Sequence, residues 1–120
     1  MGLTVLIVDD HAGFRGFARR LLEAGGLEVI GEAASAASAL SAAEELKPGV
    51  VLLDIRLPDG NGIDVATRLS EAEAGPAVVL VSSRDAAAYG PRLERCGARG
   101  FIPKAELTAA GVVALIEAGA

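Results

Sequence analysis

Three acidic side chains come directly after two apolar runs of strand length. Asp54 ends the run 50–53, and Asp9 and Asp10 end the run 3–8. A buried strand that ends on a carboxylate places it at the C-terminal edge of a sheet, where open α/β sheets bind their ligands. If the two strands are neighbours, the three carboxylates share one pocket. Such crowding of like charges is unfavourable unless a cation lies among them.

Further polar side chains follow two later apolar runs. Ser82 and Ser83 follow the run 77–81, and Lys104 follows the run 100–102. In a parallel sheet these ends fall at the same edge as the carboxylates. We therefore expect one edge to collect carboxylates, hydroxyl groups and a single ammonium group.

This set of groups suits metal-assisted phosphoryl chemistry. Carboxylate oxygens are ligands for Mg²⁺, with Mn²⁺ as an alternative ion. A carboxylate beside the metal can attack phosphorus and form an acyl phosphate, and the phosphoryl charge then needs an ammonium and a hydroxyl donor. Asp54, Asp10, Lys104 and Ser82 supply these roles. No phosphate-binding glycine loop is present, and His11 is the single histidine, which leaves no Ser-His-Asp arrangement.

The elements that must position these groups alternate strictly between strand and helix patterns. This alternation predicts a single three-layer α/β/α domain with a five-stranded parallel sheet and five helices. Right-handed crossovers, and a crevice shared by the first and third strands, favour the strand order 2-1-3-4-5. The expected strands are 3–8, 28–33, 50–53, 77–81 and 100–102, and the expected helices are 12–24, 36–46, 63–72, 85–97 and 108–118.

Local signals refine three of these helices. The pattern in 12–24 turns Phe14 and Phe17 inward, and Ser35 is placed to cap the second helix, whose apolar stripe includes Leu46. Pro91 falls inside the fourth helical pattern. Because proline is tolerated in the first helical turn and not in the interior, we expect this helix to begin late, near Pro91.

Composition excludes several classes of function. The 120 residues suffice for one domain, and 52% are apolar with three Phe and one Tyr, so the core must be aliphatic. A net charge of −5 argues against nucleic-acid binding, and one Cys excludes an internal disulfide and a cysteine zinc site. No signal peptide or membrane span is evident. We expect a soluble, cytoplasmic domain.

The motifs, taken together, resemble the receiver domain of bacterial two-component response regulators, a CheY-like, flavodoxin-like fold. The resemblance covers essentially the whole chain and is most similar to the NarL/FixJ (LuxR-type) subfamily. It depends on motifs in this order: Asp9-Asp10, Asp54 with Pro58 and Gly62 after it, Val81-Ser82-Ser83, and the segment 97–104 that ends in Pro103-Lys104.

The resemblance implies a role for each of the polar residues. Asp54 would accept a phosphoryl group from a phosphohistidine on a sensor histidine kinase. Asp9, Asp10 and Asp54, with the backbone carbonyl of Arg56, would hold Mg²⁺. Lys104 would contact the phosphoryl group. The chain would then be a signalling domain and not an enzyme, with at most slow autodephosphorylation.

Two further positions would transmit the switch. Ser82 would turn toward the phosphoryl group and Phe101 would follow it inward, although Phe101 lacks a hydroxyl group and can respond only by packing. The face formed by the fourth helix, the fifth strand and the last helix would change and control an output such as transcription. That face, or the surfaces of the first and last helices, would support a homodimer.

Some positions depart from the family or carry separate hypotheses. Ala105 follows Lys104 where the family often has proline, which leaves the isomer of that peptide bond open. Arg56 and Arg84 would flank the phosphoryl group and slow its loss to water. Ser83 is an alternative hydroxyl donor if the fourth strand is shifted by one residue.

Other polar residues have simpler interpretations. His11 is expected to be partly exposed at a helix start, and Tyr89 to lie on the output surface. Asp59 and Asn61 are interpreted as turn residues.

Two other functions compete with the receiver interpretation. A magnesium-dependent phosphatase with an aspartyl nucleophile usually has two Asp residues two positions apart, whereas Asp9 and Asp10 are adjacent. A pseudo-receiver that acts by binding alone is disfavoured by the intact acidic set and Lys104. We interpret 1–120 as the receiver domain, with any helix-turn-helix output domain, and DNA binding with it, outside this chain. An excised domain is favoured over a stand-alone regulator.

Overall fold

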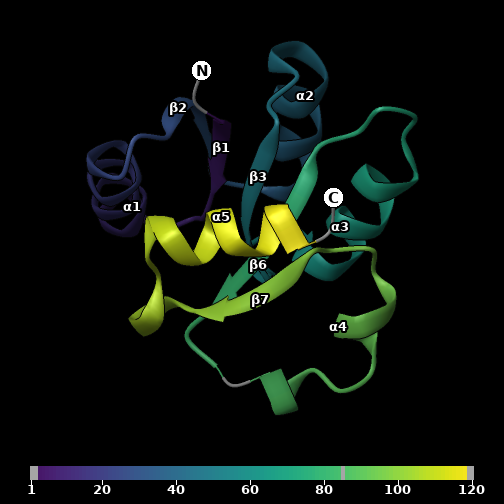
Figure 1. Cartoon of the computed structure of the whole chain (residues 1–120). Coiled ribbons are helices and arrows are strands. Elements are labelled where there is room, and N and C mark those ends of the chain that lie inside the picture. The colour runs from purple at the N-terminus through teal and green to yellow at the C-terminus, as the bar shows by residue number, and fades with distance from the viewer. Residues whose placement is uncertain (1–2, 85, 119–120) are drawn as a thin grey trace.

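A computed structural model describes residues 3–84 and 86–118, which form a parallel sheet between two layers of helices (Figure 1). The sheet strands are β1 (Thr4–Val8), β2 (Glu28–Ala33), β3 (Val50–Asp54), β6 (Ala77–Ser82) and β7 (Gly100–Pro103). The helices are α1 (Ala12–Ala24), α2 (Ala36–Leu46), α3 (Gly62–Glu71), α4 (Arg92–Arg95) and α5 (Ala109–Ala118). Two 3₁₀ turns, Ala86–Ala88 and Lys104–Glu106, precede α4 and α5.

The strand order β2-β1-β3-β6-β7 confirms the predicted topology, because β6 and β7 are the fourth and fifth strands of the sheet. All four neighbouring pairs are parallel. The C-terminal ends of the strands therefore meet at one edge of the sheet. In the register of the central pair, Asp54 lies opposite Val81, which brings the end of β3 beside the end of β6.

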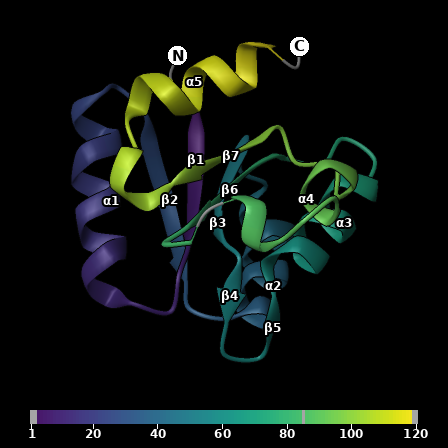
Figure 2. The ribbon, with the colours of Figure 1, turned by 90° about the horizontal axis from the view of Figure 1, so that it is seen from below.

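The sheet has a separate aliphatic core on each face. Helices α1 and α5 cover one face, and α2, α3 and α4 cover the other (Figure 2). Strand β3 contributes to both cores, with Val51 and Leu53 on the α2–α3 side and Val50 and Leu52 on the α1–α5 side. Burial on both faces explains why this strand is a continuous apolar run instead of an alternating one.

Helix α4 is a single turn of four residues that begins at Arg92. The expectation of a late start near Pro91 is confirmed, and Pro91 occupies the N-cap position. Ser35 caps α2 as predicted, and its side chain and that of Ser38 form a reciprocal capping box.

Two expectations about burial were wrong. Phe17 is 46% exposed and Leu46 is 38% exposed, although both fall on the apolar stripes of their helices. The apolar side chains of α1 span a wider part of the helix surface than the sheet covers. The buried residues of α1 are Ala18 and Leu22. Leu46 is the last residue of α2.

A two-residue hairpin between β3 and α3 was not anticipated. Strand β4 (Arg56–Leu57) pairs antiparallel with β5 (Gly60–Asn61) outside the main sheet. The peptide bond between Lys104 and Ala105 is trans, as are the others in the described ranges. Within those ranges no helix combines the length and the apolar character that crossing a bilayer requires.

Candidate functional site

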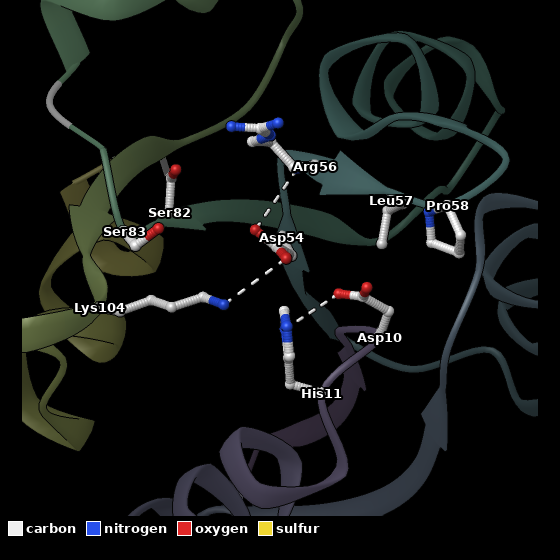
Figure 3. Close-up of a pocket in the computed structure, with 9 residues that line it drawn as sticks. All are labelled: Asp10, His11, Asp54, Arg56, Leu57, Pro58, Ser82, Ser83 and Lys104. Carbon is white, nitrogen blue, oxygen red and sulfur yellow. Dashed lines mark hydrogen bonds and ion pairs between the residues drawn. The ribbon is translucent and has the colours of Figure 1, made fainter.

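Asp54 lies at the bottom of an open pocket at the C-terminal edge of the sheet (Figure 3). Asp54 is 4% exposed, yet it lines the pocket. The pocket has a volume of about 360 Å³, and we call it the acidic pocket. Its lining residues are Asp10, His11, Asp54, Arg56, Leu57, Pro58, Ser82, Ser83 and Lys104.

The backbone around Asp54 is fixed by the close approach of α3. The N–H of Gly62 donates a 2.6 Å hydrogen bond to the carbonyl of Ile55. A Cβ at position 62 would lie 2.8 Å from the Cα of Ile55 and would overlap the carbonyl oxygen of Asp54. Only glycine leaves room for this contact, so Gly62 lets α3 pack against the chain that carries Asp54.

A buried ion pair joins Asp9 to Lys104. Asp9 is 0% exposed, and its Oδ2 lies 2.5 Å from the Lys104 Nζ. The same Nζ is 3.5 Å from Asp54 Oδ2 and 4.4 Å from the centre of the Phe14 ring. Asp9 Oδ2 is buried and makes no conventional hydrogen bond. Lys104 thus provides one ammonium group for two carboxylates, and it lies against an aromatic face.

Asp10 and His11 form the more exposed side of the site. The His11 Nδ1 lies 3.1 Å from Asp10 Oδ1 and 3.2 Å from Asp9 Oδ1. The backbone N–H of His11 donates to Asp9 Oδ1 at 2.8 Å. His11 is the N-cap residue of α1 and its side chain is 73% exposed, as expected.

The charges in the pocket are not balanced. The pKa of Asp54 is raised from 3.8 to about 6, first because burial disfavours its charged form and then because Asp9 is negative. Lys104 and the backbone N–H of Arg56, which donates to Asp54 Oδ1 at 3.4 Å, act in the opposite direction. The net effect makes Asp54 harder to ionise than a free aspartate, as expected for a buried carboxylate beside a second one.

The donor atoms of this site fit a hard cation. Asp9, Asp10, His11 and Asp54 each offer one ligand atom, and these atoms lie within 4.8 Å of one another. Three of the four donors are carboxylate oxygens, and Asp9 Oδ2 has no partner besides the lysine ammonium among the described residues. An oxygen-rich set of this kind suits Mg²⁺ or Mn²⁺ better than a softer metal.

Ser82 is buried at the end of β6, and its hydroxyl group is engaged elsewhere. The Ser82 Oγ lies 2.6 Å from the Tyr89 hydroxyl and accepts a 3.1 Å hydrogen bond from the Arg84 N–H. The rings of Tyr89 and Phe101 are 6.4 Å apart at an angle of 53°. Tyr89 was expected on the output surface, but it is half-buried and packs against the α2–α3 core.

The two arginines occupy different pockets. Arg56 lines the acidic pocket and also a second pocket of about 360 Å³ beside it. Arg84 lines only the second pocket, together with Tyr89. Arg56 therefore shares the acidic pocket with Asp54, whereas Arg84 lines only the neighbouring pocket. Their effect on the lifetime of a phosphoryl group stays a prediction.

Asp59 and Asn61 do more than form a turn. The Asp59 carboxylate accepts hydrogen bonds from the N–H groups of Ala36 at 2.7 Å and Ala37 at 3.0 Å, at the start of α2. Asn61 caps α3 by accepting a 2.7 Å hydrogen bond from the Ile63 N–H. The β4–β5 hairpin therefore connects the starts of two helices at the rim of the acidic pocket.

A doubly covered parallel sheet of this strand order, with an acidic pocket and a lysine at its C-terminal edge, defines a CheY-like receiver fold. The family model of the response regulator receiver domain matches residues 5–116 of this sequence. The chain belongs to this family, whose members serve two-component signalling.

Relatives support the assignment and its subfamily. The chain is 37% identical over 103 residues to the response regulator GacA of Pseudomonas protegens, covering 85% of this chain and 48% of the relative. It is 32% identical over 116 residues to the DNA-binding transcriptional activator EvgA of Escherichia coli K12, covering 97% and 56%. The chain thus spans about half the length of these curated relatives.

Solved structures agree with the sequence relatives. The signal receiver domain of NarL from Mycobacterium tuberculosis superposes with a TM-score of 0.85 at 32% identity, covering 96% of this chain and 97% of that one. A LuxR-family two-component response regulator from Aurantimonas gives a TM-score of 0.84 at 28% identity, covering 98% and 84%. Both are consistent with a NarL/FixJ-like receiver.

Proposed function

We propose that this chain accepts a phosphoryl group on Asp54 from a phosphohistidine of a sensor histidine kinase. The observation that carries the proposal is the position of Asp54. Its carboxylate ends the central strand, faces an open pocket, and lies 3.5 Å from the Lys104 ammonium beside a buried second carboxylate. A nucleophile and the charges that its product needs are therefore adjacent.

The transfer is a displacement at phosphorus. An Asp54 carboxylate oxygen forms the new bond to phosphorus while the bond from phosphorus to the histidine nitrogen breaks, and the imidazole leaves with its electron pair. Lys104 already contacts Asp54 and stabilises the negative oxygens of the phosphoryl group after transfer. The Ser82 hydroxyl donates a hydrogen bond to one of these oxygens. Water later cleaves the acyl phosphate and restores the carboxylate.

The residues that would hold Mg²⁺ are Asp9, Asp10, Asp54 and the backbone carbonyl of Arg56, with Mn²⁺ as a substitute. When bound, the ion supplies positive charge that offsets the carboxylates and the phosphoryl oxygens. The clustering of these carboxylates supports this assignment, because like charges so close together favour a cation among them.

Phosphorylation then alters an output. We place the change on the face formed by α4, β7 and α5, because Ser82 lines the acidic pocket at the end of β6 and Phe101 lies on the neighbouring strand β7. The chain acts as a receiver for an output domain outside it, of the helix-turn-helix type, and any control of transcription in the cytoplasm is exerted through that domain. A homodimer would use this face or the α1 and α5 surfaces. The domain is a phosphoacceptor and not an enzyme.

Incubation with acetyl phosphate and Mg²⁺, followed by intact-mass measurement, tests the proposal. A receiver gains the mass of one phosphoryl group, and the Asp54→Asn variant does not. Release of many equivalents of phosphate without a phosphoprotein would instead identify a phosphatase. The absence of both would identify a pseudo-receiver. An equal gain of mass in the Asp54→Asn variant would refute Asp54 as the acceptor.

A further inference from the structure

The hydroxyl group proposed to receive the phosphoryl oxygen is already hydrogen-bonded to Tyr89. The Ser82 Oγ and the Tyr89 hydroxyl are 2.6 Å apart, and Ser82 is 1% exposed. In Figure 3 the Ser82 hydroxyl points away from Asp54. Ser82 makes no hydrogen bond to Asp54 or Lys104, all three of which lie in the described part of the chain.

The hydrogen-bonding capacity of Ser82 is nearly exhausted by these contacts. A serine hydroxyl has one hydrogen and two lone pairs. The Arg84 N–H occupies one lone pair at 3.1 Å. If Ser82 is the donor to Tyr89, no hydrogen remains for a phosphoryl oxygen. If Tyr89 is the donor, both lone pairs are filled and the Ser82 hydrogen is free, but the hydroxyl group points away from Asp54 (Figure 3). In either case the Ser82 hydroxyl must turn from its place beside Tyr89 before it can contact a phosphoryl group on Asp54.

The ring of Tyr89 connects this hydrogen bond to the output face. It lies 6.4 Å from the Phe101 ring, and both side chains pack against the α2–α3 core. Phe101 has no hydroxyl group, so it cannot take part in a polar exchange with Ser82. Tyr89 therefore contacts both residues: its hydroxyl group is hydrogen-bonded to Ser82, and its ring packs near the ring of Phe101.

We infer that Tyr89 is a positioning residue that holds the Ser82 hydroxyl away from Asp54 until phosphorylation, an inference that rests on the proposed function. Loss of the Ser82–Tyr89 hydrogen bond then accompanies formation of the bond from Ser82 to the phosphoryl group. Movement of Tyr89 passes the change to Phe101. The segment before α4 thereby takes part in the switch, as well as the strand end that carries Ser82.

Beryllofluoride, a mimic of the phosphoryl group, tests this inference with Mg²⁺ present. Tyr89→Phe removes the hydroxyl group and keeps the ring, so its contact with Phe101 is retained. We expect this variant to bind beryllofluoride about fivefold more tightly than the wild type, because Ser82 no longer gives up a hydrogen bond on binding. Fluorine NMR measures the bound fraction in both proteins.

A double-mutant cycle separates this role from a packing role. In a Ser82→Ala background, Tyr89→Phe should leave the affinity unchanged, because the partner hydroxyl is gone. In a Ser41→Ala background the fivefold effect should persist, since Ser41 is exposed on α2 and lies outside the acidic pocket. An effect of the same size in all backgrounds, or none in the wild-type background, would overturn the inference.

The wild-type protein provides an independent readout. Tyr89 is the single tyrosine and the chain has no tryptophan, so intrinsic tyrosine fluorescence reports on this residue alone. We expect the emission to change when beryllofluoride binds, and unchanged emission would contradict the inference. If the wild type binds beryllofluoride and the tyrosine signal is silent, only this inference fails. If the wild type neither binds it nor forms a phosphoprotein, the proposed function fails as well.

Discussion

Replacing Asp54 by Asn should stabilise the protein in metal-free buffer. The gain should develop as the pH rises from the ordinary pKa of 3.8 through the folded pKa of about 6. The folded pKa of Asp54 is about 6, above its ordinary value of 3.8. A group with a raised folded pKa contributes stability that is fully present below the unfolded pKa and is lost as the pH rises through the folded pKa. Asparagine is neutral throughout, so the variant does not lose this contribution.

The magnitude follows from the pKa shift. A shift from 3.8 to about 6 is about two units, and each unit corresponds to about 1.4 kcal/mol. The resulting ~3 kcal/mol is an upper value, because Asp54 lines an open pocket where solvent screens its charge. We expect the variant to be more stable than the wild type by about 1–2 kcal/mol near pH 8, and by almost nothing near pH 4.

Urea unfolding with a chelator present, followed by circular dichroism, measures the difference. Asp64→Asn is a matched control, because the Asp64 side chain is 75% exposed at the start of α3 and should give no comparable gain at high pH. Addition of Mg²⁺ should stabilise the wild type more than Asp54→Asn, since a ligand of the folded state raises stability with its concentration. An Asp54→Asn variant that is less stable near pH 8, or equally stabilised at both pH values, would refute the charge argument.

Three other predictions concern residues that support or border the acidic pocket, namely Gly62, Arg56 and Asp59. Gly62→Ala should cost about 2–3 kcal/mol in urea unfolding because its Cβ would press on backbone atoms, whereas Gly13→Ala, with no atom within 4 Å of the new Cβ, should gain about 0.5–1 kcal/mol. Arg56→Ala should shorten the half-life of the phosphoprotein, measured by loss of phosphoryl mass, and should do so more than Arg84→Ala; unchanged lifetimes in both would exclude a shielding role. The hydrogen bonds that Asp59 accepts from α2 lower its pKa, so they stabilise the fold above the unfolded pKa and lose this effect as the pH falls through the folded pKa. Asp59→Ala should therefore reduce the melting temperature at neutral pH and much less in acid; an equal reduction at both pH values would contradict this.

The sheet and its polar edge were predictable because they depend on local patterns. The apolar run that ends on Asp54 indicated both a buried strand and the position of the carboxylate. The alternation of strands and helices, with right-handed crossovers and a crevice shared by the first and third strands, was sufficient to predict the strand order. Pro91 located the start of α4 because proline restricts the backbone in a known way.

The parts that the sequence did not reveal depend on contacts between distant segments. Asp59 caps a helix that begins 23 residues earlier, and no local pattern indicates such a partner. Tyr89 reaches Ser82 through a connecting segment without hydrophobic periodicity. The pairing of Lys104 with Asp9, closer than with Asp54, depends on the path of β7 relative to β1, which motif spacing does not specify.

The shortness of α4 has a consequence for amide hydrogen exchange. In any helix the first four N–H groups lack partners within the helix, and α4 has only four residues. Its first turn is held instead by hydrogen bonds from Leu93 to Gly90 and from Glu94 to Pro91. Transient opening of this segment breaks few hydrogen bonds, so its amides should exchange with solvent far sooner than those of β3. The α4 segment beside Tyr89 can therefore open locally while the central strands keep their hydrogen bonds.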